Sequence, residues 1–317
     1  ISRTSMCNWA MKAAEACMPL LNLIRDEISD GDLINIDETP VQVLVEPGRD
    51  PTTKSYMWIF RRGDPKKPAL IYQYHPTRSG DVAVAFLRDF AGYVQTDGYR
   101  GYDFIDDEPD MVHVGCWAHV RRKFMDVIAA QGKNRKTNGS ADVALSYIRS
   151  LYRIEKEAKE KKLKPKEIYA ERQEKAAPIV EKFRKWVFKR AQHTPPKGLL
   201  GQAITYAVNQ WPRLEGYLLD GRISMDNNAA ENSIRPFVVG RKNWLFSGTA
   251  EGAAASAALY SLVETAKANG LEPYSYFRHI FDKLPITETI TDLEALLPWN
   301  LDRNALLTAV TGVETGG

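Results

Sequence analysis

A run of strand-forming residues with one acidic side chain in its middle constrains this chain more than any other feature. Residues 33–44 read Leu-Ile-Asn-Ile-Asp-Glu-Thr-Pro-Val-Gln-Val-Leu, which predicts a buried strand. Because side chains alternate along a strand, Asp37 shares one face with Asn35 and Thr39. Glu38 faces the opposite way and cannot serve the same site. A carboxylate inside a core strand is costly unless it is compensated, so Asp37 is either a structural hydrogen-bonding residue or part of a cation site.

The segments around this run predict a mixed α/β fold. Apolar residues with helical spacing lie at 1–28 and 81–90, and strand-like runs lie at 55–60, 69–74, 92–99 and 112–117. Long, charged helical segments occupy about 121–220, which we interpret as an all-helical insertion. We therefore expect a helical lead-in at 1–28, a sheet-bearing core at 29–120, the insertion at 121–220, the rest of the core at 221–285 and a tail at 286–317.

Charge is unevenly distributed along the chain. The net charge is only +3, but residues 151–190 hold 14 Lys and Arg against 7 Asp and Glu. Such asymmetry is typical of a protein that offers one face to a polyanion. The alternative is that the lysines and arginines only solvate long helices.

Cysteine content and hydropathy exclude several classes of protein. Three widely spaced cysteines give no disulfide framework and indicate a reducing compartment. No signal peptide is recognisable, and the most apolar stretch, at 252–263, is too short to span a bilayer. We therefore expect a soluble, cytoplasmic protein without a membrane partner.

Three acidic residues stand at positions suited to metal chemistry. Asp37 lies within a predicted strand, Asp97 ends another, and Glu231 follows the insertion on a predicted helix. Mg²⁺ prefers carboxylate oxygens, and two ions about 3.5–4 Å apart need carboxylates from several elements. Spacing alone is weak support, because other acids compete for these places: Asp103, Asp106, Asp107 and Asp226.

Asp226 and Glu231 are alternatives for the third acid. They are five positions apart, a rotation of about 140° on a helix, so they cannot share a face. Asp226 is a suitable N-cap for a short helix, which we expect to end or kink at Arg235 because Pro236 follows. Glu231 has no capping role and shares a face with Asn228 and Arg235. We therefore predict Glu231 as the third acid.

Several motifs resemble those of the bacterial insertion sequence 66 family of transposases, in the expected order over roughly residues 1–285. They are Ile-Asp-Glu-Thr-Pro at 36–40, Thr-Asp-Gly-Tyr at 96–99, Cys-Trp-Ala-His-Val-Arg-Arg-Lys-Phe at 116–124, Asp-Asn-Asn-Ala-Ala-Glu at 226–231 and Gly-Arg-Lys-Asn at 240–243. The resemblance implies a DDE enzyme whose RNase H-like mixed sheet is flanked by helices and interrupted by the helical insertion between the second Asp and the Glu.

The resemblance also implies a chemistry and its partners. Asp37, Asp97 and Glu231 are then the catalytic and metal-binding triad, with Mg²⁺ or Mn²⁺, as two ions, for the cofactor. The activity is metal-dependent hydrolysis at transposon ends followed by strand transfer of the 3′-OH into target DNA. The partners are transposon-end and target DNA, at the bacterial nucleoid. A homo-oligomer and accessory proteins encoded by the same element are compatible with it, and we expect an upstream DNA-binding region to lie outside this sequence.

Residues beside these motifs are candidate DNA contacts. They are His119, Arg121, Arg122, Asn228, Arg235, Arg241 and Lys242. A guanidinium suits phosphate because it binds in bidentate fashion. His119 has an equal structural alternative, a half-buried ring satisfied by a backbone carbonyl. Cys116 and His119 also form half of a zinc motif, but no companion pair of ligands is evident, so zinc is the weaker interpretation. Trp244 is assigned to the core rather than to base stacking.

Other classes of protein remain open from the sequence. A domesticated DNA-binding protein would need no intact triad, and an RNase H-like nuclease would cleave without strand transfer. A glycoside hydrolase with two carboxylates would need neither a third acid nor a basic insertion. A glycoside hydrolase of this kind needs no metal ion, so a metal-dependent activity would exclude it.

Overall fold

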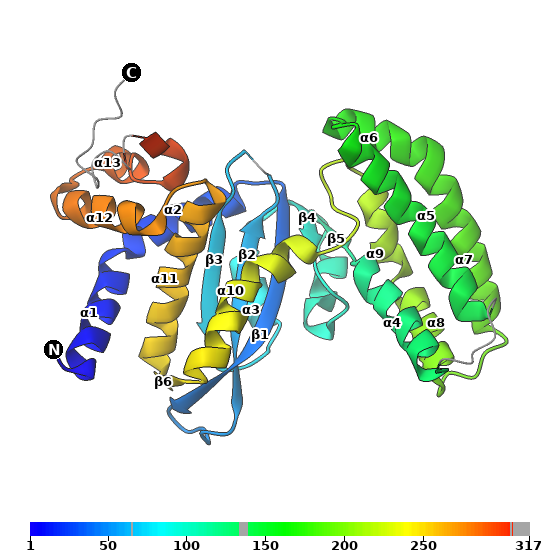
Figure 1. Ribbon diagram of the computed structural model, residues 1–317, viewed down its shortest axis with the longest axis horizontal. Helices are drawn as coiled ribbons and strands as arrows, with labels where there is room; N and C mark the ends of the chain where they lie inside the picture. The colour runs from blue at the N-terminus through cyan, green and yellow to red at the C-terminus, as the bar shows by residue number, and fades with distance from the viewer. Residues whose placement is uncertain (65, 133–138, 305, 307–317) are drawn as a thin grey trace. The chain divides into compact units, whose positions relative to one another are not determined.

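The computed structural model describes residues 1–64, 66–132, 139–304 and 306 (Figure 1). The chain divides into two compact units, which we call unit 1 (residues 1–91 and from 230 onward) and unit 2 (residues 92–229). The strands are β1 (Leu33–Val45), β2 (Lys54–Arg62), β3 (Leu70–His75), β4 (Gly92–Gln95), β5 (Met111–Val114) and β6 (Ser247–Thr249). The α-helices are α1 (Arg3–Ala16), α2 (Met18–Ser29), α3 (Asp81–Phe86), α4 (Trp117–Ala130), α5 (Ser140–Glu160), α6 (Pro165–Glu171), α7 (Ala177–Ala191), α8 (Leu199–Asn209), α9 (Trp211–Glu215), α10 (Asn228–Trp244), α11 (Ala250–Ala268), α12 (Pro273–Lys283) and α13 (Ile290–Glu294). Within these residues, no helix is both long and apolar enough to cross a membrane.

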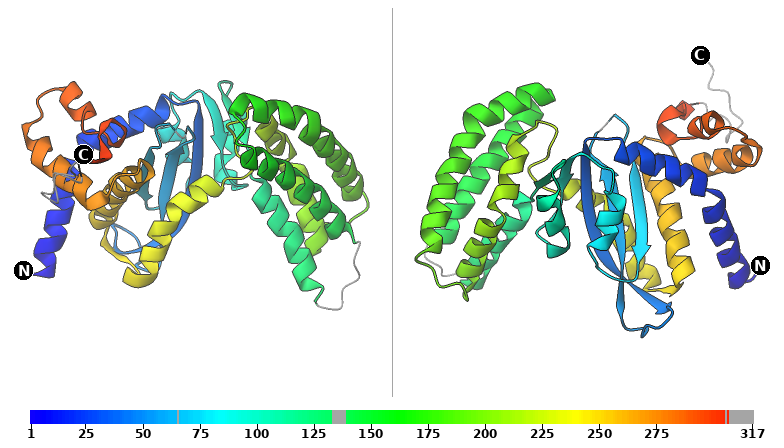
Figure 2. Two further views of the ribbon diagram at one scale, coloured as in Figure 1. Left: turned by 45° about the horizontal axis from the view of Figure 1, so that its top comes forward. Right: turned by 180° about the vertical axis from the view of Figure 1, so that it is seen from behind.

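Unit 1 is built on a mixed sheet. β2 pairs antiparallel with both β1 and β3, and β6 pairs parallel with β1 through Val43 and Ser247. One face of the sheet packs on α10 and α11 (Figures 1 and 2). On the other face, the Phe86 ring of α3 stacks on the Phe60 ring, with the ring centroids 3.7 Å apart. The predicted mixed α/β sheet flanked by helices is therefore confirmed.

The outer strand of this sheet is covered by α11. The Ser261 hydroxyl accepts a hydrogen bond from the Tyr72 backbone N–H at 2.8 Å, and the Thr265 hydroxyl accepts one from Leu70 at 3.1 Å. An uncovered strand edge would present such N–H groups to another chain. Two buried hydroxyls on one helix thus replace the missing neighbouring strand.

Unit 2 combines two parallel strands with helices. β4 and β5 pair in parallel from Gly92 with Met111 to Gln95 with Val114. Its helical part encloses an aromatic core in which the Trp117 ring lies 5.8 Å from Trp211 and 6.1 Å from Phe183. The Trp117 indole N–H donates to the Leu214 carbonyl at 3.0 Å. The long, charged helices therefore enclose apolar stripes, as their spacing predicts.

Two predicted boundaries are wrong. The strand expected at 112–117 ends at Val114, and Trp117 begins α4. The helix expected to end or kink at Arg235 does not end there but runs on to Trp244 with Pro236 inside it. In the second case burial of Ile234 and Phe237 against the sheet offsets the hydrogen bond that proline removes.

Candidate active site

Asp37 lies in the middle of β1 on the face that α10 covers. Its neighbours on that face, Asn35 and Thr39, accept hydrogen bonds at 3.2 Å from two arginines, Arg61 of β2 and Arg241 of α10 respectively. Burial lowers the pKa of both guanidinium groups from their usual range, but both stay charged at neutral pH. The half-buried Asp37 carboxylate is thus flanked by positive charge, which suits a phosphate.

Glu38 faces the opposite side of β1, as strand alternation predicts. Its carboxylate accepts a hydrogen bond from Arg78 Nε at 2.6 Å, and its side chain is only 1% exposed. The ion pair with Arg78 gives Glu38 a structural role. Two adjacent acids in the motif at 36–40 therefore have different environments.

Glu231 lies in the first turn of α10 and is half-buried. The helix is fixed on the sheet by its buried residues Ala230, Ile234 and Phe237, and the Tyr72 hydroxyl donates to the Ser233 carbonyl. Soon after α10 ends, β6 pairs with Val43. Glu231 is therefore at the end of the helix away from β6, just as Asp37 precedes the part of β1 that β6 contacts.

The segment that leads into α10 is anchored within unit 2. Gln95 of β4 donates through its side-chain amide to the Ser224 carbonyl at 2.8 Å. The backbone N–H of Trp117 donates to the Met225 carbonyl at 3.2 Å, and that of Asn227 donates to Cys116 Sγ at 3.2 Å. The residues just before Glu231 are thus held by β4 and by the start of α4.

Asp97 follows β4 in a tight turn of unit 2. Its Oδ1 accepts the Tyr99 backbone N–H at 2.8 Å, as in an Asx turn. A Cβ at Gly98 would lie 2.5 Å from the Tyr206 hydroxyl oxygen, so the turn needs glycine because the ring approaches so closely. The half-buried Asp97 is therefore held by its own backbone turn.

A chain of side chains, in which Thr96 and His113 are buried and Asp106 is exposed, supports this turn. The Thr96 hydroxyl lies 2.8 Å both from His113 Nε2 and from the Asp97 carbonyl oxygen, and His113 Nδ1 lies 2.9 Å from Asp106. Burial lowers the pKa of His113 to about 4, so the ring is neutral at pH 7. Its Nδ1–H then donates to Asp106, while the single proton of the Thr96 hydroxyl is donated to the Asp97 carbonyl oxygen. We call Thr96, His113, Asp106 and Arg213 the turn network.

Arg213 explains why two competing acids are not candidates for the metal site. Its Nη2 donates to Asp103 Oδ1 at 2.6 Å, and its Nε donates to both Asp106 oxygens at 3.1 Å. Both carboxylates are therefore occupied by one guanidinium that is itself 8% exposed. Their role is structural.

Asp226 is also occupied, but it is not the N-cap that the sequence predicts. The first helical residue of α10 is Asn228, which places Asn227 at the N-cap position. The Asp226 carboxylate accepts the Asn228 backbone N–H at 3.1 Å and the Tyr152 hydroxyl at 3.2 Å. Glu231 is thus the better candidate for the third acid.

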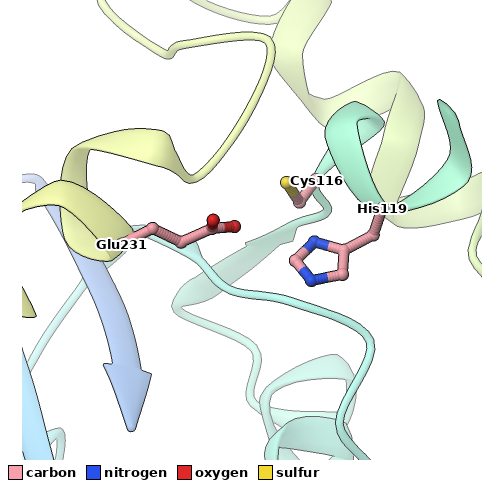
Figure 3. Close-up of side chains that lie close together, drawn as sticks. All are labelled: Cys116, His119 and Glu231. Carbon is pink, nitrogen blue, oxygen red and sulfur yellow. The ribbon is translucent and has the colours of Figure 1, made fainter. Parts of the chain in front are cut away.

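Cys116 and His119 lie at the start of α4, and Figure 3 draws them together with Glu231 from the first turn of α10. The Cys116 sulfur and a His119 ring nitrogen are within 4.8 Å of each other. Burial raises the pKa of the Cys116 thiol to about 12, so it is a neutral thiol at pH 7. The Asn227 backbone N–H donates to this sulfur at 3.2 Å.

The candidate DNA-binding residues are distributed over both units. Arg121 and Arg122 are exposed on α4, whereas Arg235 and Lys242 are exposed on α10. Arg241 is partly buried and engaged with Thr39, and Trp244 packs against the core cluster as predicted. In the basic stretch, several cations pair with a glutamate one helical turn away: Lys156 with Glu160, Lys175 with Glu171 and Lys185 with Glu181. Part of that charge is therefore neutralised locally.

Sequence reasoning missed Arg61, the turn network and Arg149 of α5. Arg61 could have been found from strand pairing, because it lies opposite Asn35. Arg149 could have been found from helical spacing, since Leu145, Arg149 and Tyr152 share a face. No local signal joins His113 to Thr96.

Comparison with known proteins places the chain in a family. The sequence model described as "Transposase IS66 family" matches residues 1–255, and that described as "IS66 C-terminal element" matches residues 261–299. Two relatives come from Sinorhizobium fredii, and both are described as uncharacterized proteins. One, y4qI, is 30% identical over 96% of this chain and 58% of its own length; the other, y4jD, is 29% identical over 95% and 60%.

The chain thus spans about six tenths of the length of these relatives. No solved structure matches it. The two family matches are consecutive and together cover nearly the whole of the described sequence. The chain belongs to the IS66 family of transposases.

Proposed function

We propose that this chain is the catalytic part of a DDE transposase that cleaves transposon ends and joins their 3′-hydroxyls to target DNA. One observation carries the proposal. Asp37 lies on the sheet face that α10 covers, and Glu231 stands in the first turn of that helix. A strand carboxylate and a helix carboxylate on one face of a sheet suit metal-dependent phosphoryl transfer.

Asp97 completes the proposed triad from unit 2. The closed turn at Gly98 and the turn network support a fixed position for Asp97. The anchoring of residues 224–227 by β4 and α4 supports a fixed start for the helix that carries Glu231. In this proposal the sheet is RNase H-like, and the helices at 121–220 are an insertion between core segments 29–120 and 221–285, with a lead-in at 1–28 and a tail at 286–317.

The donor set fits hard divalent cations. Asp37, Asp97 and Glu231 offer only carboxylate oxygens, which Mg²⁺ and Mn²⁺ prefer over the nitrogen and sulfur ligands that zinc takes. Bound as a pair, such ions supply the Lewis acidity that activates water or a 3′-hydroxyl and neutralises the leaving oxygen. The residues of the chain hold the carboxylates in place and, through Arg61 and Arg241, add positive charge beside Asp37.

DNA binding in this proposal uses residues of both units. Arg121, Arg122 and His119 of α4 and Asn228, Arg235 and Lys242 of α10 contact phosphates, while Arg241 holds the face of Asp37. The substrate is transposon-end DNA and then target DNA, in the bacterial cytoplasm. A second copy of the chain and accessory proteins of the same element are compatible with this role.

Nicking of transposon-end DNA with Mg²⁺ or Mn²⁺ tests the proposal. We expect Asp37→Asn to lose at least about a thousandfold in rate, because a metal ligand is worth several kcal/mol of transition-state stabilisation. Retained melting temperature and DNA affinity are the controls. Nicking without joined product would indicate a nuclease without strand transfer. DNA binding without any cleavage by the unaltered chain would indicate a domesticated DNA-binding protein.

A further inference from the structure

A cavity of about 680 Å³ lies within unit 2, between α4, α5 and residues 226–228. Its volume is within the range of about 300–1,000 Å³ that small-molecule sites occupy. The α4 side of the cavity includes Arg121, Arg122 and Met125, and the α5 side includes Leu145, Arg149 and Tyr152. Each set follows helical spacing, so one face of α4 and one face of α5 form two sides of the cavity. None of these residues belongs to the proposed metal triad.

The cavity concentrates positive charge. Three arginines line it, and within the described part of the chain neither Arg121 nor Arg149 forms an ion pair. By contrast, Arg153, one turn further along α5, pairs with Glu157 at 3.9 Å. Arg121 and Arg149, which line the cavity without an ion pair of their own among the described residues, favour an anion there, and the forked geometry of a guanidinium suits phosphate.

The rest of the wall is apolar and aromatic. Leu145 is buried, and Met125 is 40% exposed. The Tyr152 ring is oriented because its hydroxyl donates to Asp226 Oδ2 at 3.2 Å. The negative charge of the Asp226 carboxylate repels a second phosphate group. Its oxygens can accept a hydrogen bond from the amino group of a base. A charged region next to a flat apolar one matches a nucleotide, which carries a phosphate and a planar base.

We propose that this cavity binds one nucleotide unit of an unpaired DNA strand. Arg121, Arg122 and Arg149 bind the phosphate, while the base lies against Met125, Leu145 and Tyr152. Duplex DNA does not fit, because its bases are stacked inside the helix. The choice of a DNA strand over a free nucleotide as the source of this unit rests on the proposed function. The cavity and its positive charge are observed independently of that function.

Fluorescence anisotropy on the full chain tests the proposal with three probes. They are a labelled single-stranded oligonucleotide, the same sequence as a blunt duplex, and a mononucleotide such as dAMP as competitor. We expect Arg149→Gln, at a cavity residue outside the proposed duplex contacts, to weaken single-strand binding at least tenfold and blunt-duplex binding less than threefold. Arg153→Gln is the matched control, because its side chain is exposed and does not line the cavity. It should change single-strand binding less than twofold.

A second variant tests the same cavity in case the arginine substitution disturbs folding. Met125→Glu places a carboxylate in the cavity at an exposed position and should also weaken single-strand binding about tenfold, with an unchanged melting temperature. Equal losses on single strand and duplex, or no loss in either variant, would overturn the proposal. Displacement of the strand by dAMP at micromolar concentration would contradict a strand site and indicate a free-nucleotide site.

The two proposals can fail separately. If Asp37→Asn nicks normally while the cavity variants lose strand binding, the metal triad is wrong and the cavity stands. If Asp37→Asn is inactive while the cavity variants bind like the unaltered chain, the cavity proposal is wrong and the metal triad stands.

Discussion

The two units hold their predicted catalytic acids in different ways. Asp37 of unit 1 lies in the middle of a 13-residue strand, so the backbone ladder with β2 sets its position. Asp97 of unit 2 follows a strand of only 4 residues, and side chains from β5, α9 and the segment between β4 and β5 support its turn. Side-chain substitutions should therefore disturb the surroundings of Asp97 more than those of Asp37. The predictions below test that difference.

The largest difference should appear when an arginine is removed from each unit. Arg213→Met leaves the Asp103 and Asp106 carboxylates without their cation. We expect a loss of about 3 kcal/mol in the free energy of unfolding, at the lower end of the values for broken ion pairs because both acids are partly exposed. Arg61→Met in unit 1 removes a hydrogen bond to Asn35 and should cost about 1 kcal/mol.

Urea unfolding followed by circular dichroism measures both variants. The comparison fails if Arg61→Met is the more destabilising of the two. Such a result would mean that the sheet face around Asp37 also depends on its side chains.

Acid should weaken the turn network through His113. Its pKa is about 4 in the folded chain because the ring is buried, whereas an unfolded histidine titrates near 6.5. Between these values the unfolded chain binds more protons, so stability is greatest above about pH 7 and falls as the pH falls from about 6.5 towards 4. The loss from this group is on the order of 3 kcal/mol at most.

His113→Gln cannot titrate and provides the comparison. Urea unfolding at pH 7 and pH 5 should show a smaller acid-induced loss for this variant than for the unaltered chain. Equal losses would show that other groups carry the pH dependence.

A smaller effect is expected from a single methyl group beside Asp97. Gly98→Ala forces the added carbon against the Tyr206 ring, and overpacking of this kind costs about 1–3 kcal/mol. Gly252→Ala in α11 is the control, because its added carbon meets only Thr249 Oγ1, at 3.4 Å. Alanine there should be neutral or stabilising, since glycine is the poorer helix former.

Melting temperatures of the two alanine variants decide this prediction. If Gly98→Ala melts like the unaltered chain, then Tyr206 moves aside without cost and the turn is less constrained than we infer.

The comparison between the units also explains how far the sequence could predict the fold. The alternating pattern at 33–44 predicts β1 and the face of Asp37 correctly, because a half-buried strand leaves a period of two. The apolar run at 112–117 could not show that Trp117 begins a helix, since a short apolar run fits a buried helix start equally well. Pro236 does not end α10, because packing of Ile234 and Phe237 on the sheet stabilises the helix beyond it.

The surroundings of the site were less predictable than its acids. Asp103 and Asp106 compete with Asp97 in the sequence, and only their contacts with Arg213, more than 100 positions away, show their structural role. His113 of β5 contacts Thr96, which directly follows β4, so the pairing of two strands brings together residues 17 positions apart. Such long-range side-chain contacts leave no periodic signal in a single sequence.

The most direct test of the central claim compares Glu231→Gln with Asp226→Asn in metal-dependent nicking and thermal melting. Glu231→Gln should abolish Mg²⁺-dependent nicking and leave the metal-free melting temperature almost unchanged. Asp226→Asn should retain substantial nicking and lose at most about 1 kcal/mol of stability, because the asparagine oxygen can still accept the Asn228 N–H and its NH2 group can donate to the Tyr152 hydroxyl oxygen. An inactive Asp226→Asn with an active Glu231→Gln would contradict the account, because the third acid would then be the wrong one.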